Sequence, residues 1–172
     1  MVFSPAGFAR GPVERAYVRT FLRSYHAAAS AVLPVVDRVL GAAPARTLLA
    51  APVFLRGDRV PADVLAGRAR EYAGSRDAFH ATFPAAIDTP VTCEPEDVPV
   101  TVAWGVFDLL LPYAIHGRRA RRILPGARHV RLDAAGHIPM FDQPERCAEL
   151  LLDTRVTEVR HPSRSATGGA AL

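Results

Sequence analysis

The stretch Val98–Trp104, with the sequence VPVTVAW, decides the fold. Its nearly continuous apolar and β-branched side chains are typical of a strand that is buried on both faces of a parallel sheet. Residues 128–132 form a second, shorter strand candidate, and helical patterns follow the two strands at 112–124 and 144–152. The alternation of strand, helix, strand and helix predicts parallel βαβ units and therefore an α/β fold.

The region upstream of this stretch has a helical pattern. From Pro12, a residue favoured at the first helical position, apolar side chains recur at three-to-four spacing, and Pro34 predicts a kink or break. Further helices are expected after Pro61 and after Ser75, which is a favourable N-cap residue. Residues 12–88 therefore predict an all-helical block.

Changes in composition and periodicity divide the chain into four segments. Residues 1–11 look like the end of a core strand and a loop, and residues 12–97 are the helical region, which ends in a proline-rich acidic loop from Thr89. Residues 98–153 carry the strand and helix alternation. Residues 154–172 lack periodicity and are expected to form a flexible tail.

Composition limits the classes of function. A chain of 172 residues that is 49% hydrophobic can bury one core. Its formal charge of +4 creates only a modest field, and the basic cluster Arg118–Arg122 has no interleaved aromatics. We expect this cluster to be a solvated helix face and expect no nucleic-acid partner.

The cysteines and the apolar runs indicate the cellular setting. Cys93 and Cys147 lie 54 positions apart without the spacing of a metal site or a disulfide framework, so both are expected to be small hydrophobic residues. No apolar run approaches the roughly 20 residues of a membrane span, and the first residues lack a secretory signal. The expectation is a cytoplasmic protein without a metal ion or other cofactor.

Two polar residues follow the two predicted strands. Asp108 comes four positions after Trp104, and His137 lies 29 positions further along, beyond the strand at 128–132. Loops at the carboxyl ends of neighbouring parallel strands lie side by side, and Gly105 and Gly136 permit tight turns there. We therefore expect a hydrogen bond between the Asp108 carboxylate and the His137 imidazole, which makes this pair the candidate catalytic acid and base.

The motifs around these residues are similar to those of a known family. The segment WGVFD ending at Asp108, the segment GHIPM around His137 and the segment DQPE from Asp142 resemble the last two strands of α/β-hydrolase fold proteins. The opening segment SPAGF, from Ser4, resembles the point where these proteins insert a helical cap. The resemblance implies a partial α/β-hydrolase fold, with about three parallel strands and a mostly helical cap over residues 12–97.

The resemblance also implies an activity. Members of this family include serine hydrolases such as esterases and lipases, in which an acid orients a histidine that acts as general base. Asp108 and His137 would take these roles on a small-molecule substrate. Because the family's cap lines its acyl pocket, Phe79 and Phe83 are candidate substrate-binding residues, although core packing is the simpler explanation for two aromatics on one helix face.

The departure from the family concerns the nucleophile. The family places its serine on a G-x-S-x-G elbow, and none of the serines here has that context: Ser4, Ser24, Ser30, Ser75, Ser163 and Ser165. The segment that forms the family's oxyanion hole is also missing, and this segment normally provides much of the catalysis. The expectation is a truncated hydrolase that is inactive alone.

Three other hypotheses stay open. The first is that the chain is half of a split hydrolase whose N-terminal half is a second polypeptide, with association, or self-association, through the exposed sheet edge. The second is a small non-catalytic module that binds a small molecule. The third is the product of a disrupted gene or a misplaced start codon.

Overall fold

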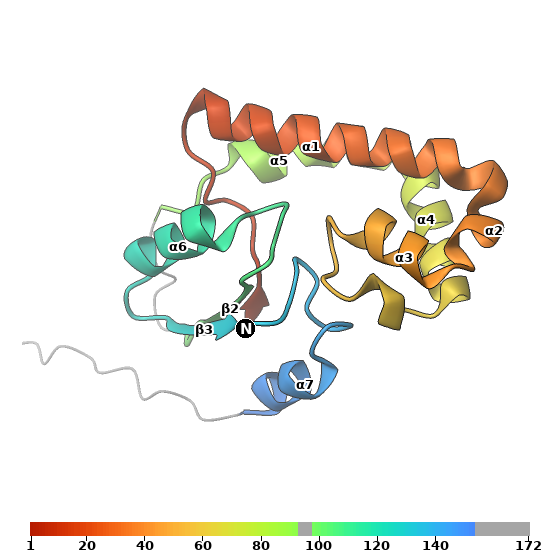
Figure 1. The fold of residues 1–172 in the computed structure, drawn as a ribbon. Helices are drawn as coiled ribbons and strands as arrows, with labels where there is room; N and C mark the ends of the chain where they lie inside the picture. Colours follow the sequence, from red (N-terminus) through yellow and green to blue (C-terminus); the bar gives the residue numbers. More distant parts are fainter. Residues whose placement is uncertain (93–97, 154–172) are drawn as a thin grey trace, which may run out of the picture.

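A computed structural model describes residues 1–92 and 98–153. It is a mixed α/β structure that combines a small sheet with helices (Figure 1). The strands are β1 (Val2–Phe3), β2 (Thr101–Gly105) and β3 (Arg128–Leu132), in the spatial order β1-β2-β3. Both neighbouring pairs are parallel, so the predicted three-stranded parallel sheet is confirmed. β2 begins three residues later than the apolar run suggested, and Val98 at the start of that run is 59% exposed.

Alternate residues of β2 face two different cores. Val102 and Trp104 pack with Leu124 and with residues of the helical region, whereas Ala103 packs with Leu132 and with Leu150 of the last helix. A strand that contributes to a core on each face has no solvated side, which explains its continuous apolar sequence. The sheet is therefore covered on both faces.

Five helices precede β2 in the described part of the chain. They are α1 (Gly11–Val32), α2 (Val36–Leu40), α3 (Ala43–Ala50), α4 (Ala62–Gly74) and α5 (Arg76–Asp88). A 3₁₀ turn at Leu33–Val35 separates α1 from α2, which confirms the break expected at Pro34. The helix expected after Pro61 is α4. α3 has no counterpart in the sequence analysis, because Pro44 lies in its first turn, where a proline starts a helix rather than interrupting it.

The N-terminus of α5 differs from the expectation in one respect. Ser75 occupies the N-cap position, but its side chain makes no capping hydrogen bond. The Ser75 hydroxyl instead donates to the carbonyl of Tyr72 at 2.8 Å, so it satisfies the end of α4. This is possible because α4 and α5 follow each other without an intervening loop.

The remaining helices flank β3. A π-helical turn at Tyr113–Gly117 leads into α6 (Arg118–Ile123), and α7 (Pro144–Leu152) ends the described part of the chain. Both helices lie where the pattern predicted them. The expectation of a solvated basic face is wrong for Arg119, because its side chain is only 15% exposed and its guanidinium pairs with Glu14.

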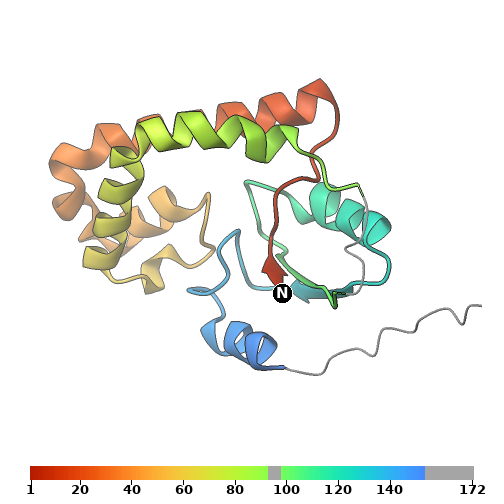
Figure 2. The same cartoon turned by 180° about the vertical axis from the view of Figure 1, so that it is seen from behind.

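Helix α1 spans both parts of the molecule. Figure 1 shows it running from above α6 to α2, and Figure 2, the view from behind, shows α5 lying along it. Near its start, Val18 belongs to the core that also contains Trp104. A separate core of residues from α2, α3, α4 and the following turns lies at the other end: Val36, Leu40, Ala50, Phe54, Val60, Leu65 and Ala66.

The two cysteines and the tail complete the comparison with the sequence. Cys147 is buried and unpaired, and burial raises the pKa of its thiol, as fits a small hydrophobic residue. Cys93 and the tail from residue 154 lie outside the described residues. Across residues 1–92 and 98–153, no helix combines the length and apolar character that crossing a bilayer requires.

Candidate functional site

Asp108 is held in a fixed position by backbone and side-chain contacts. It follows β2 in a tight turn, where its N–H donates to the carbonyl of Gly105 at 3.3 Å. Its carboxylate is buried, and Oδ1 accepts the N–H of Leu111 at 2.7 Å. The second oxygen, Oδ2, lies 2.9 Å from Nδ1 of His137. Both carboxylate oxygens therefore have partners, and the group cannot rotate without losing them.

Two backbone contacts bring the Asp108 and His137 loops together. Beyond the ends of β2 and β3, the N–H of Phe107 donates to the carbonyl of Ala135 at 3.0 Å. Gly105 has no Cβ, and one placed there would lie 2.0 Å from the carbonyl oxygen of Gly136. Only glycine permits this approach, so the turn predicted at Gly105 is a requirement of the site.

The Asp108–His137 pair has the geometry of an oriented imidazole. The His137 side chain is 21% exposed, whereas that of Asp108 is fully buried. A carboxylate that accepts the Nδ1 proton keeps the lone pair on Nε2, where it can accept a proton from a hydroxyl or water. Within residues 1–92 and 98–153, Nε2 of His137 makes no hydrogen bond. The structure thus brings together the two residues that the sequence singled out.

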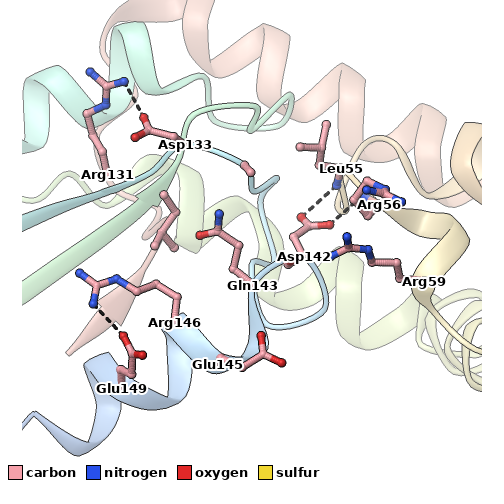
Figure 3. Close-up of a pocket in the computed structure, with 12 residues that line it drawn as sticks. Leu55, Arg56, Arg59, Arg131, Asp133, Asp142, Gln143, Glu145, Arg146 and Glu149 are labelled. Atoms are coloured by element: carbon pink, nitrogen blue, oxygen red, sulfur yellow. Dashed lines mark hydrogen bonds and ion pairs between the residues drawn. The ribbon is translucent and has the colours of Figure 1, made fainter.

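A second buried carboxylate, Asp142, lies beside this pair. Figure 3 shows it facing Leu55 and Arg56, whose backbone N–H groups it accepts at 2.9 and 2.7 Å. It also accepts the N–H of Gly136 at 2.8 Å. The sequence marked Asp142 only as part of a helix start, but α7 begins at Pro144, and the carboxylate binds amides of other segments. Nothing in the local sequence indicates those distant partners.

An open apolar groove lies next to the Asp108–His137 pair. It has a volume of about 620 Å³, and its lining comes from α1 and from the turn after α3: Val13, Ala16, Tyr17, Thr20, Phe21, Ser24, Tyr25 and Pro52. The hydroxyl of Tyr17 donates to the carbonyl of Leu109 at 2.7 Å. Pro52 precedes Val53, whose carbonyl accepts the N–H of Ile138 at 2.8 Å. Two lining residues are therefore tied to the neighbours of Asp108 and His137.

Electrostatics agree with this proximity. Burial raises the pKa of the Tyr17 phenol, and the negative charge of Asp108 raises it further. The three-to-four spacing that follows Pro12 predicts the helix face on which Tyr17, Phe21 and Tyr25 lie, but it does not indicate a groove. The periodicity that places side chains on one face does not say whether another element covers that face.

The aromatic residues proposed for substrate binding lie elsewhere. Phe79 and Phe83 of α5 stack on each other with ring centroids 4.6 Å apart, and Phe79 also stacks on the buried His26 at 5.3 Å. Neither is among the residues that line the groove. Their substrate-binding role stays a prediction. In the structure the two side chains pack between helices.

A second depression, drawn in Figure 3, lies between α7, the end of β3 and the turn after α3. Four arginines and four carboxylates line it, and neighbouring members pair: Arg131 with Asp133 at 2.6 Å and Arg146 with Glu149 at 2.9 Å. Equal numbers of opposite charges leave no net attraction for an anion or a cation. No group of three metal-ligating side chains occurs in the part of the chain that the structure describes.

Comparison with known proteins identifies distant relatives only. No family model matches the sequence, and no solved structure matches it. Uncharacterized proteins of Mycobacterium bovis and Mycobacterium tuberculosis are 32% identical over 56 residues. The match covers 33% of this chain and 16% of the length of each relative. It therefore concerns a short segment, and the names of these relatives state no activity.

Proposed function

We propose that this chain carries the acid and base of an α/β-hydrolase, with His137 as general base and Asp108 as the residue that orients it. The observation behind the proposal is the 2.9 Å contact between Nδ1 of His137 and a fully buried carboxylate. In this proposal β1 to β3 with α6 and α7 correspond to the C-terminal part of the hydrolase core, and residues 12–97 correspond to its cap. The reaction is the hydrolysis of an ester or a related bond.

The substrate class follows from the groove beside the pair. Its walls are mostly apolar, and Tyr17 and Pro52 connect it to the two loops that carry Asp108 and His137. A groove of this kind suits an extended apolar group, with the reacting carbonyl beside Nε2 of His137. The substrate we propose is therefore a small molecule whose acyl or alkyl part is apolar.

The nucleophile is the part that these residues do not provide. The sequence has no G-x-S-x-G, and Ser4, at the end of β1, is 3% exposed, so solvent and substrate do not reach it. We therefore expect no turnover of p-nitrophenyl esters by the chain alone and no labelling of a serine by a fluorophosphonate probe. Stoichiometric serine labelling would contradict this part of the proposal.

An added nucleophile tests the base directly. Hydroxylamine attacks the carbonyl of a p-nitrophenyl ester, its proton passes to Nε2 of His137, and p-nitrophenolate leaves as the hydroxamate forms. A positioned general base typically accelerates such a step by about 100-fold or more. We expect the protein-dependent rate to fall by about this factor in His137→Ala and by a smaller factor in Asp108→Asn.

The matched control is His80→Ala. His80 is exposed on α5, so its loss removes an imidazole without touching the pair. Its rate should equal that of the wild type. Equal rates in the wild type and in His137→Ala would show that His137 is not the base.

A non-catalytic binding module is the second candidate function. The observation that favours it is an apolar groove in a chain without the family's nucleophile motif. In that case p-nitrophenyl esters would perturb the resonances of Tyr17 and Phe21, and hydroxylamine cleavage would not depend on His137.

The sheet edge favours association with another polypeptide. In the described part of the chain β1 has a hydrogen-bonded neighbour on one side only, which is β2, and Val2 is 39% exposed. An unpaired strand edge is a template for another strand. Self-association, or a partner that brings the nucleophile, would use this edge, and sedimentation of a Val2→Pro variant should show weaker association than that of the wild type.

A further inference from the structure

Asp142 joins two segments that are far apart in the sequence. Its carboxylate is buried and accepts three backbone N–H groups, two from Leu55 and Arg56 and one from Gly136, which precedes His137. We call Val53–Arg56 the strap. Because a carboxylate has few acceptor sites left after three such bonds, this one is nearly saturated by the strap and the His137 loop together.

Two further close approaches join the strap to the His137 loop. The N–H of Ile138, directly after His137, donates to the carbonyl of Val53 at 2.8 Å. A Cβ on Gly136, directly before His137, would lie 3.0 Å from the amide nitrogen of Leu55 and 3.0 Å from the carbonyl oxygen of Val53. The strap therefore touches the backbone on both sides of His137.

The chemistry of Asp142 explains why these segments hold together. A buried carboxylate costs free energy unless hydrogen bonds replace its hydration, and charge-assisted bonds to amides are stronger than neutral ones. No side chain of the described residues donates to this carboxylate; Arg59 donates instead to the Asp142 backbone carbonyl, at 3.4 Å. The amides of the strap and of the His137 loop replace the water that would otherwise hydrate this carboxylate. If either segment moved away, the buried charge would lose hydrogen-bond partners.

We propose that Asp142 is a positioning residue that fixes His137 relative to the strap and, through the adjoining Pro52, relative to the groove. The inference rests on the proposed role of His137 as a base. In this arrangement the strap, the Pro52 side of the groove and the imidazole move as one unit. Loss of the Asp142 charge releases the strap and lets the His137 loop shift away from Asp108.

The test uses the full chain and needs no turnover. Amide hydrogen exchange of Leu55, Arg56 and Gly136 is compared with that of β2, together with the downfield Nδ1 proton resonance of His137 bonded to Asp108. In Asp142→Asn we expect exchange at these three amides to rise about tenfold or more, because each loses a charge-assisted bond. We also expect the His137 resonance to broaden or disappear while the amides of β2 keep their rates.

Asp133→Asn is the matched control. Asp133 lines the same depression, but its carboxylate is exposed and pairs only with the guanidinium of Arg131 among the described residues. Its substitution removes the same charge, and all of the signals above should stay unchanged. Asp142→Glu, which keeps the carboxylate, should restore part of the protection.

Three outcomes would overturn the inference. The first concerns amide exchange in the wild type: the amides of Leu55 and Arg56 are unprotected while that of Gly136 is protected. This measurement does not depend on whether any variant folds. The second is a uniform rise at all amides of Asp142→Asn, including those of β2, which is what a merely structural residue gives. The third is an intact His137 resonance after the strap is released. These outcomes are independent of the hydroxylamine assay, which tests the base itself.

Discussion

The sheet region, made of β1 and residues 98–153, and the helices α1 to α5 of the helical region fix their side chains in different ways. In the sheet region, buried carboxylates are held by backbone amides, as in Asp108 with Leu111 and Asp142 with Gly136. In the helical region, rings pack on rings, as in the stack of His26 on Phe79. Hydrogen bonds fix the orientation of a side chain, whereas ring packing mainly fixes the volume that the side chain fills. Directed bonds thus occur in the region that carries the proposed chemistry.

Among the substitutions that test this contrast, Gly105→Ala is expected to have the largest effect on stability. A methyl group there would meet the backbone carbonyl of Gly136 at 2.0 Å, and backbone cannot move aside cheaply. We expect a loss of about 3 kcal/mol in the free energy of unfolding, measured by urea denaturation. We also expect the His137 Nδ1 proton signal to disappear, because the two loops are pushed apart.

The same substitution in the helical region should have the opposite sign. Gly67 lies inside α4, and a Cβ there meets nothing within 4 Å. Gly67→Ala should therefore stabilise the protein by about 0.5–1 kcal/mol through a lower cost of ordering the helix. A destabilising Gly67→Ala, or a neutral Gly105→Ala, would remove the proposed difference between the regions.

Phe79→Ala tests how the helical region is held. The ring stacks on Phe83 and on His26 and is half-buried, so its loss should cost about 2 kcal/mol, less than for a fully buried ring. The hydroxylamine reaction at His137 should keep its wild-type rate in the folded variant. A rate that falls while stability is unchanged would instead support a substrate-binding role for Phe79.

A further test concerns the ion pair that bridges the regions. Arg119 of α6 binds Glu14 of α1 through two contacts of 2.5 and 2.8 Å, and its hydrogen bonding lowers the pKa of Glu14 to about 2. Because the two side chains keep some exposure, 15% and 28%, we expect Glu14→Gln to cost about 1 kcal/mol at pH 7.

The pH dependence of that cost has a defined sign. The Glu14 pKa in the folded protein lies below its ordinary value of 4.5, so the stabilisation is present above pH 4.5 and is lost as the pH falls toward 2. Wild type and Glu14→Gln should therefore converge in stability between these values. A difference that stays constant from pH 7 to pH 2.5 would show that the carboxylate charge is not responsible.

The sheet region could be predicted well from the sequence. β3 and α7 have the bounds that the pattern indicated, and Asp108 and His137 meet as expected. These signals are local: apolar strands, a proline at a helix start, and loops that adjoining parallel strands bring together.

The helical region and the links between the regions could not be predicted to the same extent. α3 was not recognised, and the groove along Tyr17 and the role of Asp142 depend on contacts between distant segments. A carboxylate that binds amides 86 and 87 positions away leaves no mark on the spacing of its neighbours. Tertiary partners of this kind cannot be predicted from periodicity and local propensity.

The pairing of β1 with β2 has a consequence for how the chain folds. Val2 pairs with Val102, so the whole helical region is the loop that this contact closes. Closing a loop of that length has a large entropic cost, and sheets built on such distant pairs form slowly. We expect the helices to collapse first and shorten the effective loop, so that β1 docks late. The rate of folding would then depend on helical residues that never touch the sheet.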